Sequence, residues 1–298
     1  MNAIPYHLLA LAVAVCWGLS VNSTKVLIDA GFGPWAVLAL RTVLAYGLLI
    51  FLSPKIFYTN LRTEVKTALL GVALVPLAHG LQNLALASGQ SSTTAVLTAT
   101  APIFTGLLAV AFFREFRFHW MSLAGTLAAL AGAACLAADA AWIAHLPEIG
   151  LWLALASAFG WAVYAMVLRT LGSLSPLLAL RKCTGYGLLA MLPFYYAEPT
   201  TKGELLMDAW NLGNVLFLAF VSLGLAHAAW HAAVRRIGEE AASFYTYAAP
   251  LAALAVGVGL MGETMSWLGI LGTVLVMAGV VVAHAGLVRV ALAMTKHG

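Results

Sequence analysis

Charge is the scarcest property of this chain of 298 residues. Charged residues make up 9% of the sequence, whereas hydrophobic residues make up 63%. A soluble domain carries charge on about 25% of its residues, so this chain lacks the polar side chains that would cover a folded surface in water. The shortage excludes an ordinary soluble protein and indicates that a lipid bilayer is the solvent.

Cysteine and catalytic motifs are scarce as well. The three cysteines, Cys16, Cys135 and Cys183, are scattered through apolar runs, which predicts neither a disulfide framework nor a metal site. His227 and His231 share a helix face, but no carboxylate or cysteine lies near them in that run. The chain also has no Gly-x-Ser-x-Gly, no His-Glu-x-x-His and no phosphate-cradling loop. We therefore expect no metal, no cofactor, no use of ATP and no enzymatic activity.

What the chain does have is a series of apolar runs, each about twenty residues long, the length that a spanning helix needs. The runs are continuous and rich in Ala, Leu and Gly, unlike the short alternating segments of a membrane β-barrel. We count ten, at about 6–25, 34–53, 67–88, 91–113, 119–138, 149–168, 175–197, 211–234, 241–262 and 266–288. The connections between them are too short for a separate soluble domain.

The basic residues show which side of the membrane the connections occupy. If the N-terminus is cytoplasmic, 12 of the 15 Lys and Arg residues fall in cytoplasmic segments, as the positive-inside rule requires. An even number of spans then places both termini in the cytoplasm. We expect a multi-pass protein of the plasma membrane, a bacterial inner membrane. Because the basic residues lie at helix ends, the net charge of +4 indicates no nucleic-acid partner.

Residues that are uncommon in the chain recur at a nearly constant spacing. Four pairs are separated by 148 positions: Pro102 and Pro250, Glu115 and Glu263, His79 and His227, Thr98 and Thr246. The segment LALRTVLAYGLL at 38–49 recurs as LALRKCTGYGLL at 178–189, and Trp17 recurs as Trp161. This agreement indicates an internal duplication, with residues 1–145 as one copy and residues 146–298 as the other.

Each copy then holds five spans, and an odd number forces the second copy to enter the membrane upside down. Inverted repeats are typical of transporters, in which two halves enclose a site near the bilayer midplane and rocking exposes it to alternate sides. The sequence therefore predicts an all-α integral membrane fold of ten transmembrane helices, arranged as two inverted five-helix repeats.

With these features the chain resembles the EamA-type ten-span members of the drug/metabolite transporter superfamily. The resemblance rests on Trp17, on Leu40-Arg41 opening the second span, on Ala101-Pro102 in the fourth, on Glu115 closing it, and on the Gly-rich fifth span. It covers nearly the whole chain and implies a ten-helix transporter that exports small metabolites, with exporters of aromatic and neutral amino acids as near relations. Carriers of drugs, or of other metabolites such as sugar or nucleotide derivatives, are the alternative. The second half departs from the pattern because Ala162, not Gly, follows Trp161, so we expect helix packing to differ there.

The two prolines, Pro102 and Pro250, are expected to kink their spans. Each removes the hydrogen bond to the carbonyl four residues earlier, which belongs to Thr98 or Thr246. In a membrane that carbonyl needs a partner from a neighbouring helix, a hydroxyl or cavity water. We expect all four residues to border the substrate; the alternative is a bend used only for packing, with the threonines bonded to their own helices.

His79 is the main candidate for substrate binding, because a polar ionisable side chain deep in a span usually faces a pathway. A hydrogen bond to a neighbouring helix is the alternative. Trp17, Trp161 and Tyr164 are candidates for the apolar walls of the same cavity, or else packing residues. The spans contain no central Asp or Glu, so we expect a small-molecule substrate with little net charge, exported or exchanged by alternating access.

Four charged residues are expected at helix ends. Arg41 and Arg181 each lie a turn or two inside a span, where an arginine can reach the interface, cap an opposing half-helix or form a gate. Glu115 and Glu263 close the fourth and ninth spans. Small residues spaced by four in the fifth and tenth spans predict close helix packing there, and a homodimer surface as a further use. The other expected partner is the lipid bilayer.

Overall fold

The computed structural model describes residues 4–54, 58–113, 120–142, 148–171, 174–198, 203–238, 242 and 244–295. Over these ranges every regular element is a helix, as the apolar runs predict. The elements of the first half are α1 (Ile4–Asp29), α2 (Pro34–Leu52), α3 (Leu61–Val72), η1 (Ala73–Gly80), α4 (Leu81–Ser88), α5 (Ser91–Thr98), α6 (Ala101–Phe113) and α7 (Trp120–Trp142). Those of the second half are α8 (Glu148–Arg169), α9 (Pro176–Ala197), η2 (Gly203–Met207), α10 (Ala209–Leu216), η3 (Phe217–Leu225), α11 (Ala226–Ile237), α13 (Ala248–Gly259) and α14 (Trp267–Thr295).

Over the described ranges, each of the ten predicted runs falls on one of ten helical stretches, some of which consist of several consecutive elements. Six stretches are long and apolar enough to cross a membrane, judged by length and composition within the described residues. They are Ile4–Asp29, Pro34–Leu52, Leu61–Ser88, Glu148–Leu168, Ala209–Ile237 and Trp267–Gly286. Local sequence sets several of their starts: Pro34 and Pro176 open α2 and α9, where a missing amide hydrogen costs nothing.

The third and eighth stretches contain a wider turn at corresponding places. Residues 73–80 (η1) and 217–225 (η3) form π-helix, in which each amide reaches one residue further back than in an α-helix. Pro76 lies inside η1 and removes one amide donor, whereas Gly224 lies at the end of η3. His79 is part of η1, and His227 follows η3 directly in α11.

The fourth stretch is broken at its centre, which corrects the prediction of a kinked but continuous helix. Helix α5 ends at Thr98, two residues form a turn, and α6 begins at Ala101 with Pro102 in its first turn. In the second half α13 begins at Ala248 after a turn at Thr246 and Tyr247, with Pro250 again in the first turn. Proline favours the first turn of a helix, so each proline starts a new helix instead of bending an old one.

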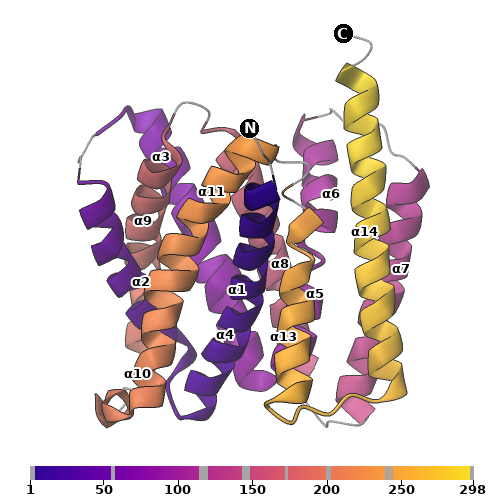
Figure 1. The fold of residues 1–298 in the computed structure, drawn as a ribbon, viewed down its shortest axis with the longest axis horizontal. Helices are drawn as coiled ribbons and strands as arrows, with labels where there is room; N and C mark the ends of the chain where they lie inside the picture. The colour runs from indigo at the N-terminus through magenta and orange to yellow at the C-terminus, as the bar shows by residue number, and fades with distance from the viewer. Residues whose placement is uncertain are drawn as a thin grey trace.

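Figure 1 shows the helices side by side in one bundle, with the first turn of α1 and the last turn of α14 at the same end. Helix α1 packs against α11 and α13 of the second half, and α8 packs in the same way against α4, α5 and α6 of the first half. Helices α2 and α9 contact each other. Corresponding helices therefore make reciprocal contacts.

Helices α7 and α14 form a pair at one edge of the bundle (Figure 1), and their main contact is with each other. A methyl group added at Gly125 would lie 2.3 Å from the Ala283 amide nitrogen, and one at Gly279 would lie 2.5 Å from that of Ala129. Backbones can approach this closely only where side chains are absent. The predicted close packing of these two spans is confirmed.

Candidate functional site

Two histidine–tryptophan pairs connect the halves near the middle of the bundle. The rings of His79 and Trp161 meet edge to face with centroids 4.9 Å apart, and those of Trp17 and His227 are tilted with centroids 5.2 Å apart. Trp17 corresponds to Trp161, and His79 corresponds to His227. Each tryptophan thus contacts the histidine of the other half, a pairing that the sequence correspondence alone did not reveal.

The His79 side chain is 6% exposed and has an unusual surplus of hydrogen-bonding capacity. Neither ring nitrogen makes a hydrogen bond within the described residues, although Gln82 lies near enough to interact weakly with the ring. A methyl group on Gly160 would lie 2.8 Å from the Ala78 amide nitrogen, and the Ser157 hydroxyl donates to the Ala78 carbonyl at 2.8 Å. These contacts hold α8 against η1 and bring Trp161 over His79. Tyr164 extends the aromatic group, with its ring centroid 5.8 Å from that of Trp161.

The corresponding pair differs because its polar groups are satisfied. The Ser222 carbonyl, in η3, accepts a hydrogen bond from the Trp17 indole at 3.3 Å and one from His227 Nδ1 at 3.2 Å. A carbonyl oxygen can only accept, so Nδ1 of His227 carries the proton. Trp230 also packs on Trp17, with centroids 5.1 Å apart. His227 is therefore held by its own helix, whereas His79 is free to bond.

The corresponding arginines, Arg41 and Arg181, are both buried, with 2% and 6% exposure. Arg181 donates from Nη1 to the carbonyl of Ser53, the C-cap residue that follows α2. It therefore caps a helix C-terminus, where a positive charge is favourable. Arg41 has an unpaired Nε and makes no ion pair with any described residue. It interacts electrostatically with both His79 and His227.

Two glutamates of the second half cap helices of the first half. Glu263 accepts from the amides of Ser91 and Ser92 at 2.6 and 3.0 Å, at the start of α5. Glu198 accepts from the amides of Trp35 and Ala36 at 3.1 and 2.9 Å, at the start of α2. Both carboxylates meet the positive end of a helix dipole. Glu115, the counterpart of Glu263, lies outside the described residues.

The threonines at the helix breaks take part in local hydrogen bonds of their own segments. The Thr98 hydroxyl donates to the carbonyl of Thr94 at 2.8 Å, within its own helix, and the Ala249 amide donates to the carbonyl of Thr246 at 3.1 Å. Pro102 and Pro250 each lie in the first turn of the helix that follows the break. The role of these four residues at the substrate stays a prediction.

A cluster that the sequence did not reveal joins α3 to α9. Glu64 is 8% exposed and accepts hydrogen bonds from Lys182 and from the Tyr186 hydroxyl, the latter at 2.8 Å. Two sequence features could have pointed to this cluster: Tyr186 is one of the repeated residues, and Glu64 is a lone acid among basic neighbours. The first turn of α3, which contains Glu64, lies at the end of the bundle where α14 terminates, and the α13–α14 connection lies at the opposite end (Figure 1).

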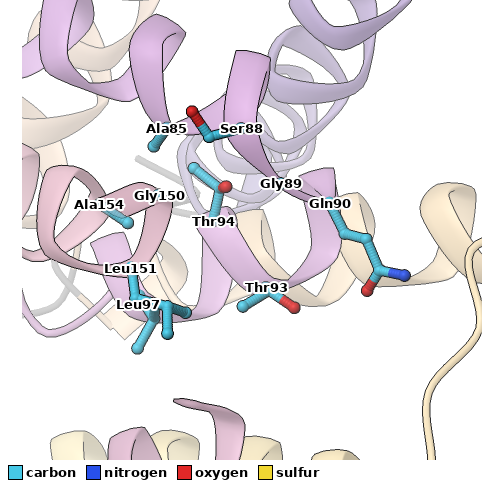
Figure 2. Close-up of a pocket in the computed structure, with 10 residues that line it drawn as sticks. All are labelled: Ala85, Ser88, Gly89, Gln90, Thr93, Thr94, Leu97, Gly150, Leu151 and Ala154. Carbon is cyan, nitrogen blue, oxygen red and sulfur yellow. The ribbon is translucent and has the colours of Figure 1, made fainter. Parts of the chain in front are cut away.

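Figure 2 shows a small pocket between α4, α5 and α8. Its free volume of about 10 Å³ is room for one water molecule. The lining is Ala85, Ser88, Gly89, Gln90, Thr93, Thr94, Leu97, Gly150, Leu151 and Ala154, which includes none of the predicted site residues. Over the described ranges, no three His, Cys, Asp or Glu side chains gather as a metal site.

Known proteins similar to this chain are transporters. The "Probable amino-acid metabolite efflux pump" of Salmonella typhimurium (strain LT2) is 28% identical over 91% of this chain and 92% of its own. An "Uncharacterized transporter" of Archaeoglobus fulgidus is 25% identical over 91% of this chain and 95% of its own. The "Probable terminal-alkyne amino-acid exporter" of Streptantibioticus cattleyicolor is 27% identical over 65% of this chain and 64% of its own.

A solved crystal structure, 21% identical, shares the fold with a TM-score of 0.62 over 96% of this chain and 98% of its own. The family description matches the chain twice, over residues 4–138 and 148–284. The protein is thus a multi-pass membrane protein of a non-enzymatic family, and the chain belongs to the EamA-like transporter family.

Proposed function

We propose that this protein exports, or exchanges, small metabolites of little net charge by alternating access, with neutral and aromatic amino acids as its substrates. The observation that carries the proposal is the reciprocal contact of Trp17 with His227 and of Trp161 with His79. It supports two inverted halves, related by a two-fold axis in the membrane plane, that meet at a central site. The relatives that are named as amino-acid exporters support the substrate class.

The contacts between halves at the two ends of the bundle support the mechanism. At one end Lys182 and Tyr186 hold Glu64, and at the other Glu263 holds the start of α5. Rocking of one half against the other would break one set of contacts while the opposite set persists, so the centre opens to one side at a time. With both termini in the cytoplasm of a bacterial inner membrane, the Glu64 cluster lies at the cytoplasmic end.

Flux measurements test the proposal. The purified protein is reconstituted into liposomes loaded with unlabelled L-phenylalanine, L-leucine or L-threonine, and entry of the radiolabelled amino acid by counterflow is measured against empty liposomes. We expect counterflow of L-phenylalanine and L-leucine without ATP. Absence of counterflow for all three, with protein shown to be folded and inserted, would refute the amino-acid assignment.

A further inference from the structure

Arg41 is a buried cation without a counter-ion. Its side chain is 2% exposed, its Nε has no hydrogen-bond partner, and no described carboxylate pairs with it. It is seven residues past Pro34, the first residue of α2, which places it about 10 Å along the helix from that end. A buried charge is costly unless it is paired, and an unpaired charge inside a membrane protein usually marks a functional site.

Arg181 shows that a buried arginine in this protein can have a hydrogen-bond acceptor within the chain. Arg181 holds the corresponding position in the second half, is buried to a similar extent, and donates to the carbonyl of Ser53, the C-cap residue that follows α2. A structural role would leave Arg41 with a comparable protein acceptor. The two equivalent arginines therefore differ in their hydrogen bonding, and Arg41 is the one with an unpaired Nε.

The residues around Arg41 suit the binding of an amphipathic molecule. Helix α2 packs on both η1 and η3, and Arg41 interacts electrostatically with both His79 and His227. His79 brings two unbonded ring nitrogens, and the indoles of Trp17 and Trp161 lie against the two histidine rings. The interior around Arg41 thus combines one positive charge, a neutral polar group and aromatic surface.

We propose that Arg41 binds the carboxylate of the transported molecule. The guanidinium is planar and matches a carboxylate with two parallel hydrogen bonds, so the substrate supplies the counter-charge that the chain lacks. No described acidic side chain is paired with these residues to receive an ammonium group. The proposal rests on the function proposed above and narrows it: the substrate must carry a carboxylate next to an apolar or aromatic body, and an amino group contributes less.

Ligand comparisons on the wild-type protein test this directly. L-phenylalanine, L-phenylalaninamide and 3-phenylpropionate are compared as inhibitors of L-phenylalanine counterflow, and L-leucine is compared with L-leucinamide. Loss of a hydrogen-bonded charge pair is worth about tenfold in affinity or more, so we expect each amide to inhibit at least about tenfold more weakly than its acid. We expect 3-phenylpropionate, which lacks only the amino group, to inhibit more strongly than the amide. Equal inhibition by acids and amides would overturn the proposal.

Variants then assign the effect to one residue. Arg41→Gln should weaken inhibition by the acid about tenfold or more and leave inhibition by the amide unchanged. The preference for the acid over its amide is then lost. Arg41→Lys should keep part of this preference. The matched control is Arg181→Gln, which should be less stable yet keep the full preference for the acid. If Arg41→Gln retained the wild-type preference, the carboxylate would bind elsewhere.

The two proposals fail in different ways. If amino acids move but acids and amides inhibit equally, Arg41 is not the carboxylate anchor while the amino-acid carrier stands. If no amino acid moves, both proposals fall. If Arg41→Gln does not fold, the wild-type comparison of acids with amides still decides the case.

Discussion

The contact between α1 and α13 yields a prediction whose magnitude can be worked out from the structure. A methyl group added at Gly18 would lie 2.2 Å from the Ala249 carbonyl oxygen and 2.9 Å from the Ala252 Cβ. Backbone cannot yield as a flexible side chain can, so Gly18→Ala must push the two helices apart by about 1 Å. Overpacking of this kind costs about 1–3 kcal/mol.

Gly47→Ala is the matched control, because Gly47 also lies inside a helix but has nothing within 4 Å of the added methyl group. Both variants gain the same helix propensity, about 0.8–1.0 kcal/mol, so their difference isolates the steric cost. We expect Gly18→Ala to be less stable than Gly47→Ala by about 1–3 kcal/mol, measured by unfolding of the detergent-solubilised protein. Gly18 follows Trp17, so counterflow should also fall.

Equal stability of the two variants would refute this reasoning. If Gly18→Ala were as stable as Gly47→Ala, then α1 and α13 would not approach as closely as the structure shows. The position of Trp17 against His227 would then lose its support, because the same helix carries Trp17 to the centre.

Three further predictions concern the site, a helix cap and the topology. His79→Ala should weaken transport by roughly five- to 150-fold at normal protein levels, whereas Cys135→Ala should have no effect; wild-type flux for His79→Ala would remove this residue from the site. Glu263→Gln should lower stability in detergent melting by about 1 kcal/mol, the usual worth of a helix cap, and an unchanged melting curve would contradict the capping role. A reporter fused after Gly298 should read as cytoplasmic, and a periplasmic signal would reverse the assigned orientation.

Most of the architecture could be predicted from the apolar runs and the repeated residues. Run length predicts spanning helices because the bilayer fixes how much apolar chain is needed. The break after Thr98 was not predictable, because a proline within a span is compatible both with a kink and with a new helix start. The π segment η3 contains no proline and left no comparable mark in the sequence.

The sequence indicates which residues are candidates for the site, but not how they are arranged. His79, Trp17 and Trp161 were singled out for their depth, but their crossed pairing depends on how the halves pack. The difference between Arg41 and Arg181 could not be predicted, since it turns on the position of the Ser53 carbonyl, 128 residues from Arg181 along the chain. Equivalent sequence positions gave no reason for one arginine to be paired and the other not.

The glycine-lined contact of α7 with α14 has a consequence for how the protein is assembled during synthesis. The chain between Trp142 and Trp267 must be made before α14 exists, which takes roughly 6–25 s at about 5–20 residues per second. Until then the surface of α7 around Gly125, which later packs on α14, faces lipid. Helix α7 is stable there by itself because its backbone hydrogen bonds are internal. His79 can meet Trp161 much earlier, once α8 has been inserted. The contact at the edge of the bundle therefore forms only after α14 has been made, later than the contact of His79 with Trp161, and a chain that stops before α14 would lack this edge contact.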